Sequence, residues 1–162
     1  MTWKVLAGSG GAQFPGSRAH NPQSLAQANE PKTFGTKVRV LVVDDEPSIC
    51  KALTMALSRA GYEPIAAQSG ESALTIIRSE HIDVMLIDLR IPDMRGDVIF
   101  EVAVGHQPHL LYQTLFMTGD ITERAHKLIA ACKCHFLRKP FDLRDMTDAI
   151  AALSPRTQDA AG

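Results

Sequence analysis

Short apolar runs, each closed by a polar or charged residue, are the feature that most restricts how this chain can fold. The clearest is Val38–Val43, a β-rich run that is almost unbroken and ends at Asp44 and Asp45. A run of this kind is typical of a strand that is covered on both faces. Four more strands are predicted, at Tyr62–Ala67, Val84–Ile87, Leu115–Met117 with a start near Tyr112, and Cys134–Leu137. Pro64 inside the second run favours the edge of a sheet for that strand.

Helical spacing of apolar residues fills the segments between these runs. In Pro47–Ala60, Ile49, Leu53 and Leu57 recur on one face, and Gly61 ends the helix. Further helices are predicted at Gly70–Ser79, Gly96–Val104, Ile121–Ala131 and Asp142–Leu153, the last with Asp142 as its N-cap. Five strands that alternate with five helices predict an α/β fold, a parallel sheet with helices on both faces.

This regular pattern covers only part of the 162 residues. Residues 1–37 are rich in Gly and Pro and have no sustained period, so we expect a flexible N-terminal extension. A short helix around Pro22–Ala28 that docks on the domain or on a partner is the alternative. Residues 38–153 form the predicted domain, and residues 154–162 form a C-terminal tail.

Composition limits the classes of partner. The formal net charge is -1, from 17 basic and 18 acidic residues, which gives no general attraction to nucleic acid or to an anionic membrane. No apolar run approaches the ~18 residues that a membrane span needs. We therefore expect no membrane insertion and no direct nucleic acid binding, since only the tail follows Leu153 and a separate DNA-binding domain has no room.

The cysteines indicate the compartment. Cys50, Cys132 and Cys134 are an odd set in a chain that has no secretory signal, which favours free thiols in a reducing cytoplasm. Cys132 to His135 resembles half of a zinc site, but no second half stands at a usual spacing. We interpret Cys132 and Cys134 as thiols that pack near the last strand.

Polar side chains follow the predicted strands where each strand ends. Asp44 and Asp45 follow the first run, Asp88 the third, Thr118 the fourth, and Lys139 the last. In a parallel α/β sheet the carboxyl ends of the strands meet at one edge, where ligands bind. These carboxylate, hydroxyl and ammonium groups are therefore expected to gather at one place.

Three clustered carboxylates need a proton or a cation. Two unit charges at about 4 Å repel by about 4 kcal/mol at an effective dielectric constant of about 20. An all-oxygen site with few protein ligands suits Mg²⁺. A metal that faces a Lys and a Thr is suited to phosphoryl transfer, and a carboxylate in such a site can accept the phosphoryl group.

Four motifs carry a resemblance to a known family, namely VRVLVVDDEPS (38–48), DVMLIDLRIPDMRG (83–96), LFMTGD (115–120) and FLRKPFD (136–142). In this order, and each at a predicted strand end, they resemble the receiver domain of two-component response regulators. The resemblance spans residues 38–153. It implies a flavodoxin-like receiver fold, a five-stranded parallel sheet of order 2-1-3-4-5 flanked by five helices.

The resemblance also implies a ligand set. Asp88 would accept a phosphoryl group from a phosphohistidine of a sensor histidine kinase or histidine phosphotransfer protein. Asp45 would bind Mg²⁺ directly and Asp44 directly or through water. Asp88 itself and the backbone carbonyl of Arg90 would complete the protein ligands of the metal.

Four further residues receive roles in the same way. Thr118 and Lys139 would contact the phosphoryl oxygens, and Gly119 would leave room for the group. Phe136 stands at the position of an aromatic switch residue, which would turn inward as Thr118 moves toward the phosphoryl group. This change would repack a surface made by the fourth helix, fifth strand and fifth helix, which the resemblance also allows as a homodimer contact.

The sequence thus predicts a stand-alone cytoplasmic signalling module that switches a protein–protein contact. We expect it to have no enzymatic activity other than self-catalysed phosphotransfer and autodephosphorylation. Three alternatives remain at this stage: the receiver portion of a hybrid sensor histidine kinase, a Mg²⁺-dependent phosphohydrolase with Asp88 as nucleophile, and a binding-only receiver in which Asp88 is idle.

Overall fold

The computed structural model describes residues 37–119, 122–132 and 134–155. Its strands are β1 (Arg39–Val43), β2 (Glu63–Ala67), β3 (Val84–Asp88), β4 (Thr114–Thr118) and β5 (His135–Arg138). Its helices are α2 (Pro47–Arg59), α3 (Gly70–Ser79), α4 (Gly96–His106), the short 3-10 helix η1 (Pro108–Leu111), α5 (Glu123–Cys132) and α6 (Leu143–Leu153). The predicted extension at 1–37 lies outside the described residues except for its last position, as do the start of the helix predicted from Ile121 and most of the predicted tail.

All five strands pair in parallel in the order β2-β1-β3-β4-β5, as the resemblance implied. Strand β2, which contains Pro64, lies at an edge of this sheet, so that prediction is confirmed. Strand β1 lies between β2 and β3, and its residues from Val40 to Val43 are fully buried. The almost unbroken apolar run therefore corresponds to a strand that is covered on both faces.

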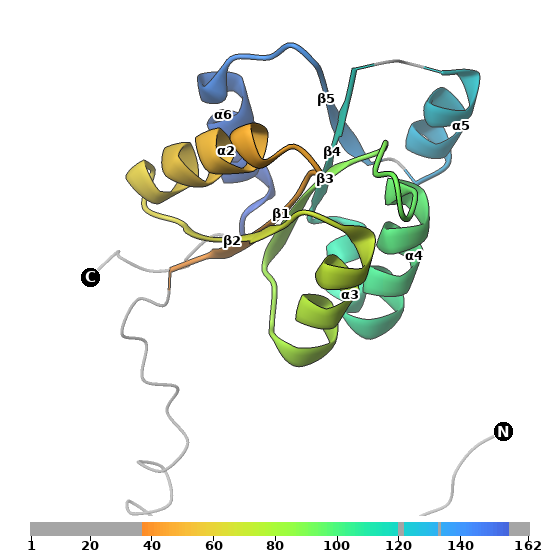
Figure 1. The fold of residues 1–162 in the computed structure, drawn as a ribbon, viewed down its shortest axis with the longest axis horizontal. Helices are drawn as coiled ribbons and strands as arrows, with labels where there is room; N and C mark the ends of the chain where they lie inside the picture. The colour runs from red at the N-terminus through yellow and green to blue at the C-terminus, as the bar shows by residue number, and fades with distance from the viewer. Residues whose placement is uncertain (1–36, 120–121, 133, 156–162) are drawn as a thin grey trace, which may run out of the picture. The chain divides into compact units, whose positions relative to one another are not determined.

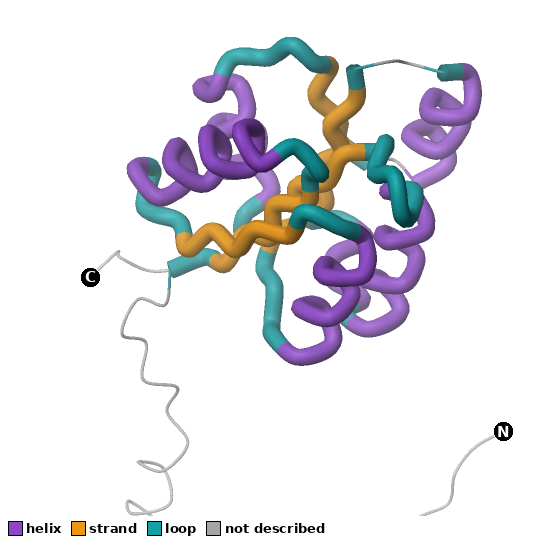
Figure 2. Tube along the Cα trace, viewed as in Figure 1, coloured by secondary structure: helices purple, strands orange, loops and turns teal. Residues whose placement is uncertain are grey.

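Helices cover both faces of the sheet (Figures 1 and 2). Val40 and Val42 of β1 face a core built with α2 and α6, which contribute residues such as Leu53 and Ile150. The alternate residues Leu41 and Val43 face a second core. Helices α3 and α4 cover this side of the sheet and contribute residues that include Ala73, Ile77, Ile99, Phe100 and Ala103.

Local signals explain where the helices begin. Pro47 occupies the first turn of α2, where its missing N–H costs nothing. Ser69 caps α3, because its hydroxyl accepts a hydrogen bond from the backbone N–H of Ser72. Asp142 stands at the N-cap position of α6 as predicted, but its side chain makes no capping hydrogen bond.

The cysteine prediction is wrong for two of the three residues. Cys132 and Cys134 form a disulfide, and their Cα atoms are 5.1 Å apart. Cys50 is a free thiol in the core, as predicted. With one pair oxidised, the cysteine count no longer argues for a reducing compartment.

None of the described helices is both long enough and apolar enough to span a bilayer.

Candidate functional site

Three carboxylates meet at the carboxyl edge of the sheet. Asp44 directly follows β1, and Asp88 is the last residue of β3, the strand paired with β1. Asp44 is fully buried, Asp88 is nearly so, and Asp45 is half-buried. One oxygen from each carboxylate lies within 4.8 Å of the other two. The predicted cluster is therefore present, and its residues are the only described group of three or more acidic, His or Cys side chains with the spacing of a metal site.

Lys139 brings a positive charge into this cluster from β5, on the far side of β4. Its Nζ donates hydrogen bonds to Asp44 Oδ2 at 2.8 Å and to Asp88 Oδ2 at 2.7 Å. Its backbone N–H donates to the carbonyl oxygen of Thr118 at 2.7 Å, which ties the residue to the end of β4. The Lys139–Pro140 peptide is cis. One ammonium thus bridges two carboxylates that are far apart in sequence.

Backbone amides hold the other carboxylate oxygens. The N–H of Arg90 donates to Asp88 Oδ1 at 2.8 Å, and the N–H of Glu46 donates to Asp44 Oδ1 at 2.9 Å. Both bonds come from the residue two positions further on, so the loop after each strand fixes the carboxylate of that strand. The acidic groups are therefore oriented before any ligand binds.

The pKa values follow from this geometry. Burial raises the pKa of Asp88, and the hydrogen bonds from Lys139 and from the N–H of Arg90 offset this only in part. Burial lowers the pKa of Lys139, but its bonds to Asp44 and Asp88 outweigh burial and raise the value above its ordinary range. Lys139 is thus an ammonium at neutral pH, and one positive charge faces three carboxylates.

This imbalance fits a hard cation. The three side chains offer only oxygen ligands, which Mg²⁺ prefers, and Asp45 is partly open to solvent, so that a bound ion could keep waters. The residues present therefore fit a divalent metal, and the metal would supply the positive charge that Lys139 alone cannot.

The structure places Thr118 at the end of β4, fully buried, with β3 and Asp88 on one side and β5 on the other. Gly119 follows it and is exposed. A Cβ added to Gly119 would lie 3.9 Å from the Cβ of Lys139, which is an ordinary contact. The protein itself therefore leaves space at Gly119, and any requirement for glycine would come from a ligand.

Phe136 lies on the edge strand β5 and is 39% exposed. It belongs to neither of the two buried cores, although it is a large aromatic residue. The predicted switch residue therefore stands in an outward position in this structure.

Two residues near the site had no predicted role. A Cβ at Gly96 would lie 2.4 Å from the carbonyl oxygen of Asp88, so the first residue of α4 packs directly against the end of β3. Asp93 accepts hydrogen bonds from the backbone N–H groups of Gly70 and Glu71, which joins the β3–α4 loop to the start of α3. The position of Gly96 at the start of a predicted helix was a sequence signal for its close packing against β3. No local sequence feature signals the hydrogen bonds that Asp93 accepts.

With the fold and the site in place, comparison with known proteins defines the class. Residues 40–151 match the family model of the response regulator receiver domain, so the chain belongs to this family. Receiver domains are phosphoacceptor signalling domains of two-component systems.

Particular relatives agree with this class. A probable transcriptional regulator, ycf27, from Guillardia theta is 34% identical over 127 residues, which is 78% of this chain and 49% of the relative. The probable transcriptional regulatory protein TcrX of Mycobacterium tuberculosis is 32% identical over 76% of this chain and 52% of its own length. A solved CheY-like receiver domain from Methanospirillum hungatei superposes with a TM-score of 0.68 at 25% identity, over 72% of this chain and 93% of that one. The chain spans about half the length of several curated regulators that it matches.

Proposed function

We propose that the chain accepts a phosphoryl group onto a carboxylate oxygen of Asp88 from a phosphohistidine of a sensor histidine kinase or histidine phosphotransfer protein. In this reaction the carboxylate oxygen attacks phosphorus, the P–N bond breaks, and the imidazole leaves as it regains a proton. The observation that carries the proposal is the contact of Lys139 with both Asp88 and Asp44 beside a third carboxylate.

Mg²⁺ would be held by Asp44, Asp45, Asp88 and the backbone carbonyl of Arg90, and it would neutralise charge on the phosphoryl oxygens. The hydrogen bond from the N–H of Arg90 to Asp88 keeps this loop close to the acceptor, which supports the assignment of the Arg90 carbonyl. In autodephosphorylation a water molecule would attack the phosphorus, the bond between phosphorus and the Asp88 oxygen would break, and inorganic phosphate would leave the regenerated carboxylate. The domain would therefore act as a signalling switch and not as a turnover enzyme.

Lys139 would contact a phosphoryl oxygen, and this contact would replace one of its two hydrogen bonds to carboxylates. Its Nζ already lies 2.7 Å from the acceptor, which supports this role. Thr118 would donate its hydroxyl to another phosphoryl oxygen, since it ends the strand beside β3. Exposed Gly119 would leave space for the group.

A cavity beside Lys139 supports docking of a protein donor. It has a volume of about 490 Å³ and lies between α2 and the loop that joins β5 to α6. Its apolar walls include Ile49, Leu53, Phe141 and Leu143, and Lys139 stands at its border. An apolar helix surface that carries a phosphohistidine could pack here and present the phosphorus to Asp88.

The output would be a protein–protein contact on the surface made by α5, β5 and α6. As Thr118 moves toward the phosphoryl group, Phe136 would turn inward and change this surface. The outward position of Phe136 supports it as the starting state. The covalent charge would then bias a pre-existing two-state equilibrium toward a form that binds a target or a second copy of the chain.

Acetyl phosphate or phosphoramidate with Mg²⁺ tests the chemistry. Intact-mass spectrometry should show the gain of one phosphoryl group, and Asp88→Asn should abolish it. Asp142→Asn, which changes an exposed aspartate on the loop after Lys139, is the matched control and should still be labelled. Full labelling of Asp88→Asn would refute the assignment of the acceptor.

The cellular context forms a separate part of the proposal. We infer that the chain is a cytoplasmic module and, because its net charge is near neutral, that it does not bind nucleic acid directly. Since the matched regulators are about twice as long, a receiver within a longer protein, such as a hybrid kinase, is the alternative. The intact mass of the native protein decides between the two, and a gel-shift assay at low salt tests nucleic acid binding.

A further inference from the structure

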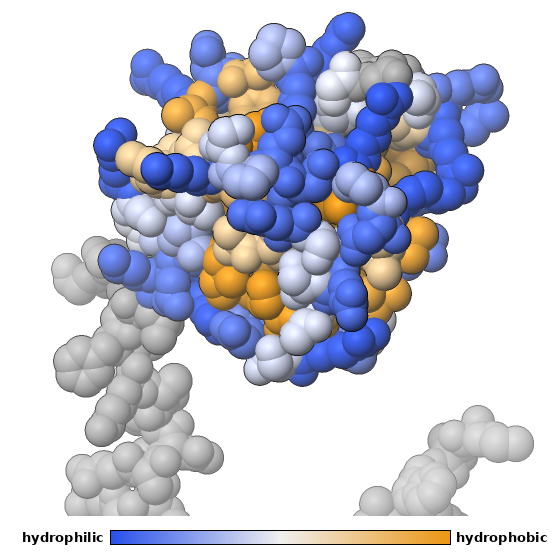
Figure 3. Space-filling view, in the orientation of Figure 1, coloured by the Kyte–Doolittle hydropathy of each residue, from blue (hydrophilic) through white to orange (hydrophobic). Residues whose placement is uncertain are grey.

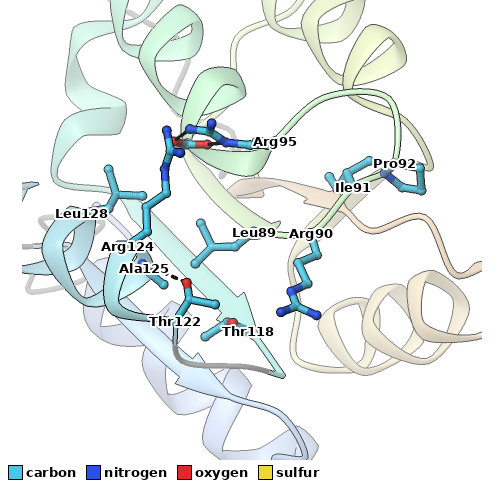
Figure 4. A pocket seen from close by; sticks show the side chains of 11 residues that line it. Leu89, Arg90, Ile91, Pro92, Arg95, Thr118, Thr122, Arg124, Ala125 and Leu128 are labelled. Carbon is cyan, nitrogen blue, oxygen red and sulfur yellow. Dashed lines mark hydrogen bonds and ion pairs between the residues drawn. The ribbon is translucent and has the colours of Figure 1, made fainter.

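A second cavity lies between α4 and α5, and it meets the proposed phosphoryl site only at Arg90 and Thr118. Its volume is about 390 Å³, and we call it the α4–α5 pocket (Figure 4). Its lining comes from the β3–α4 loop, the first turn of α4, the end of β4 and α5. Pockets of this size are typical of sites that take a small molecule or a few anchoring side chains.

The walls of the α4–α5 pocket are largely apolar. Leu89, Ile91 and Pro92 contribute from the β3–α4 loop, and Ala125 and Leu128 contribute from the facing side of α5. Figure 4 shows Leu89 between the two sides of the pocket. The face of the molecule in Figure 3 is mostly hydrophilic, with apolar residues visible in smaller patches. An apolar wall that stays open to solvent favours a partner that can cover it.

The charged residues of the pocket are mainly basic. Arg90, Arg95 and Arg124 line it together with a single acid, Asp97. Asp97 is already engaged, because the Arg95 guanidinium donates two hydrogen bonds to its carboxylate. Arg124 makes no ion pair with any of the described residues, and its side chain points toward Arg95 at one end of the pocket (Figure 4). Arg124 is therefore available to a carboxylate from outside.

A side-chain cap fixes the start of α5, where Arg124 lies. Thr122 precedes the helix, and its hydroxyl accepts a hydrogen bond from the backbone N–H of Ala125 at 3.2 Å (dashed in Figure 4). This is an N-cap contact, which fixes the backbone of the first turn. The Cα of Arg124 is thus held at the pocket border, while its exposed side chain can turn toward a ligand.

We propose that the α4–α5 pocket binds an acidic segment of a partner protein, which inserts one large apolar side chain between Leu89 and Leu128 and pairs a carboxylate with Arg124. Arginine is enriched among the residues that dominate affinity at protein interfaces, and such residues lie in or beside apolar, desolvated pockets. A bidentate guanidinium–carboxylate pair would set the orientation of the segment. A peptide is favoured over a small anion because a lone ion gains little from an exposed arginine, whereas a peptide engages the apolar walls as well.

The test uses the full chain labelled with ¹⁵N, without Mg²⁺ or phosphodonor, so that the result does not depend on phosphorylation of Asp88. The probe is an acetylated, amidated pentapeptide in which aspartates flank a central phenylalanine. Two control peptides replace the aspartates by asparagines or the phenylalanine by alanine. We expect amide shift changes concentrated at residues 89–92 and 122–128, and weaker binding of both control peptides.

Arg124→Ala should weaken binding by about threefold to tenfold, as expected for loss of a charge-assisted hydrogen bond at the surface. Lys127→Ala is the matched control. It removes the same charge from the same helix, but Lys127 pairs with Glu123 and does not line the pocket, so affinity should change by less than about twofold.

Several results would overturn the proposal. They are shift changes that centre on the cavity near Phe141, equal losses for Arg124→Ala and Lys127→Ala, or no binding at millimolar peptide. Phenylacetate that binds as tightly as the peptide would assign the pocket to small organic anions instead. Tight binding of the asparagine peptide would show that the arginines have no part in recognition.

Discussion

The close approach of Gly96 to the phosphoacceptor residue allows a sharp test of the packing argument. A Cβ at this position would lie 2.4 Å from the carbonyl oxygen of Asp88 and 2.9 Å from the Cα of Leu89. Both neighbours are backbone atoms, so no side-chain rotation can relieve the contact. Gly96→Ala should therefore displace the first turn of α4 from the end of β3.

The magnitude follows from the distances. Comfortable contacts between heavy atoms begin near 3.5 Å, so the two segments must separate by about 1 Å. Overpacking of this kind costs about 1–3 kcal/mol. The reduced entropy of the unfolded chain offsets about 0.4–1 kcal/mol of that cost. The centres of these two ranges give a net loss of about 1.3 kcal/mol, which lowers the urea midpoint by about 0.6 M at a denaturant slope of about 2 kcal/mol per M.

Gly105→Ala is a control on the same helix. A Cβ at Gly105 would meet no atom within 4 Å, so this substitution has only the benefit of the better helix former. It should raise stability by about 0.4–1 kcal/mol. Urea unfolding followed by far-ultraviolet circular dichroism measures both variants. The reasoning fails if Gly96→Ala is as stable as the wild type, or if both alanines shift the midpoint in the same direction.

Three further predictions concern charge, metal and backbone conformation. The N–H groups of Gly70 and Glu71 hold the pKa of Asp93 below its ordinary value. The ionised carboxylate therefore stabilises the folded state fully above about pH 4, and this stabilisation is lost as the pH falls further. Asp93→Asn should lower the urea midpoint at pH 7, and the difference from the wild type should shrink in acid. Mg²⁺ at ten times its dissociation constant should stabilise the domain by about 1.4 kcal/mol, and EDTA or Asp45→Asn should remove this gain in a thermal melt. Gly61 has a φ of 92°, and a Cβ added there would meet no atom within 4 Å, so Gly61→Ala should cost about 1 kcal/mol from backbone strain alone, and Gly61→Asn should cost less in the same urea assay.

The fold was predictable because its signals are local. The apolar run at Val38–Val43 differs from the observed β1 by one residue at its start, and Gly70–Ser79 matches α3 at both ends. The short helix η1, Pro108–Leu111, was not predicted, since four residues are too few to show a period. The Cys132–Cys134 disulfide was also missed, because a count of cysteines does not show which of them lie close enough to pair.

The grouping of the site was predictable for a different reason. Parallel strands bring their carboxyl ends to one edge, so Asp44, Asp88 and Thr118 had to lie near each other once the strand order was known. The pairing of Lys139 with both Asp44 and Asp88 could not be derived in this way. It depends on the reach of a long side chain across β4, and strand order alone does not determine that reach.

The helices on the two sides of the site are packed to different degrees, and this affects which of them can move when the site changes. On the α3–α4 side, Gly96 packs against Asp88, and Asp93 is bonded to the start of α3. On the other side, Ala125 is the only buried residue of α5 among those described, whereas α3 buries four of its residues, from Gly70 to Ile77. A helix with few buried contacts shifts at a lower free-energy cost than one packed along its length. A change at Thr118 should therefore be taken up by α5, which borders both the proposed output surface and the α4–α5 pocket.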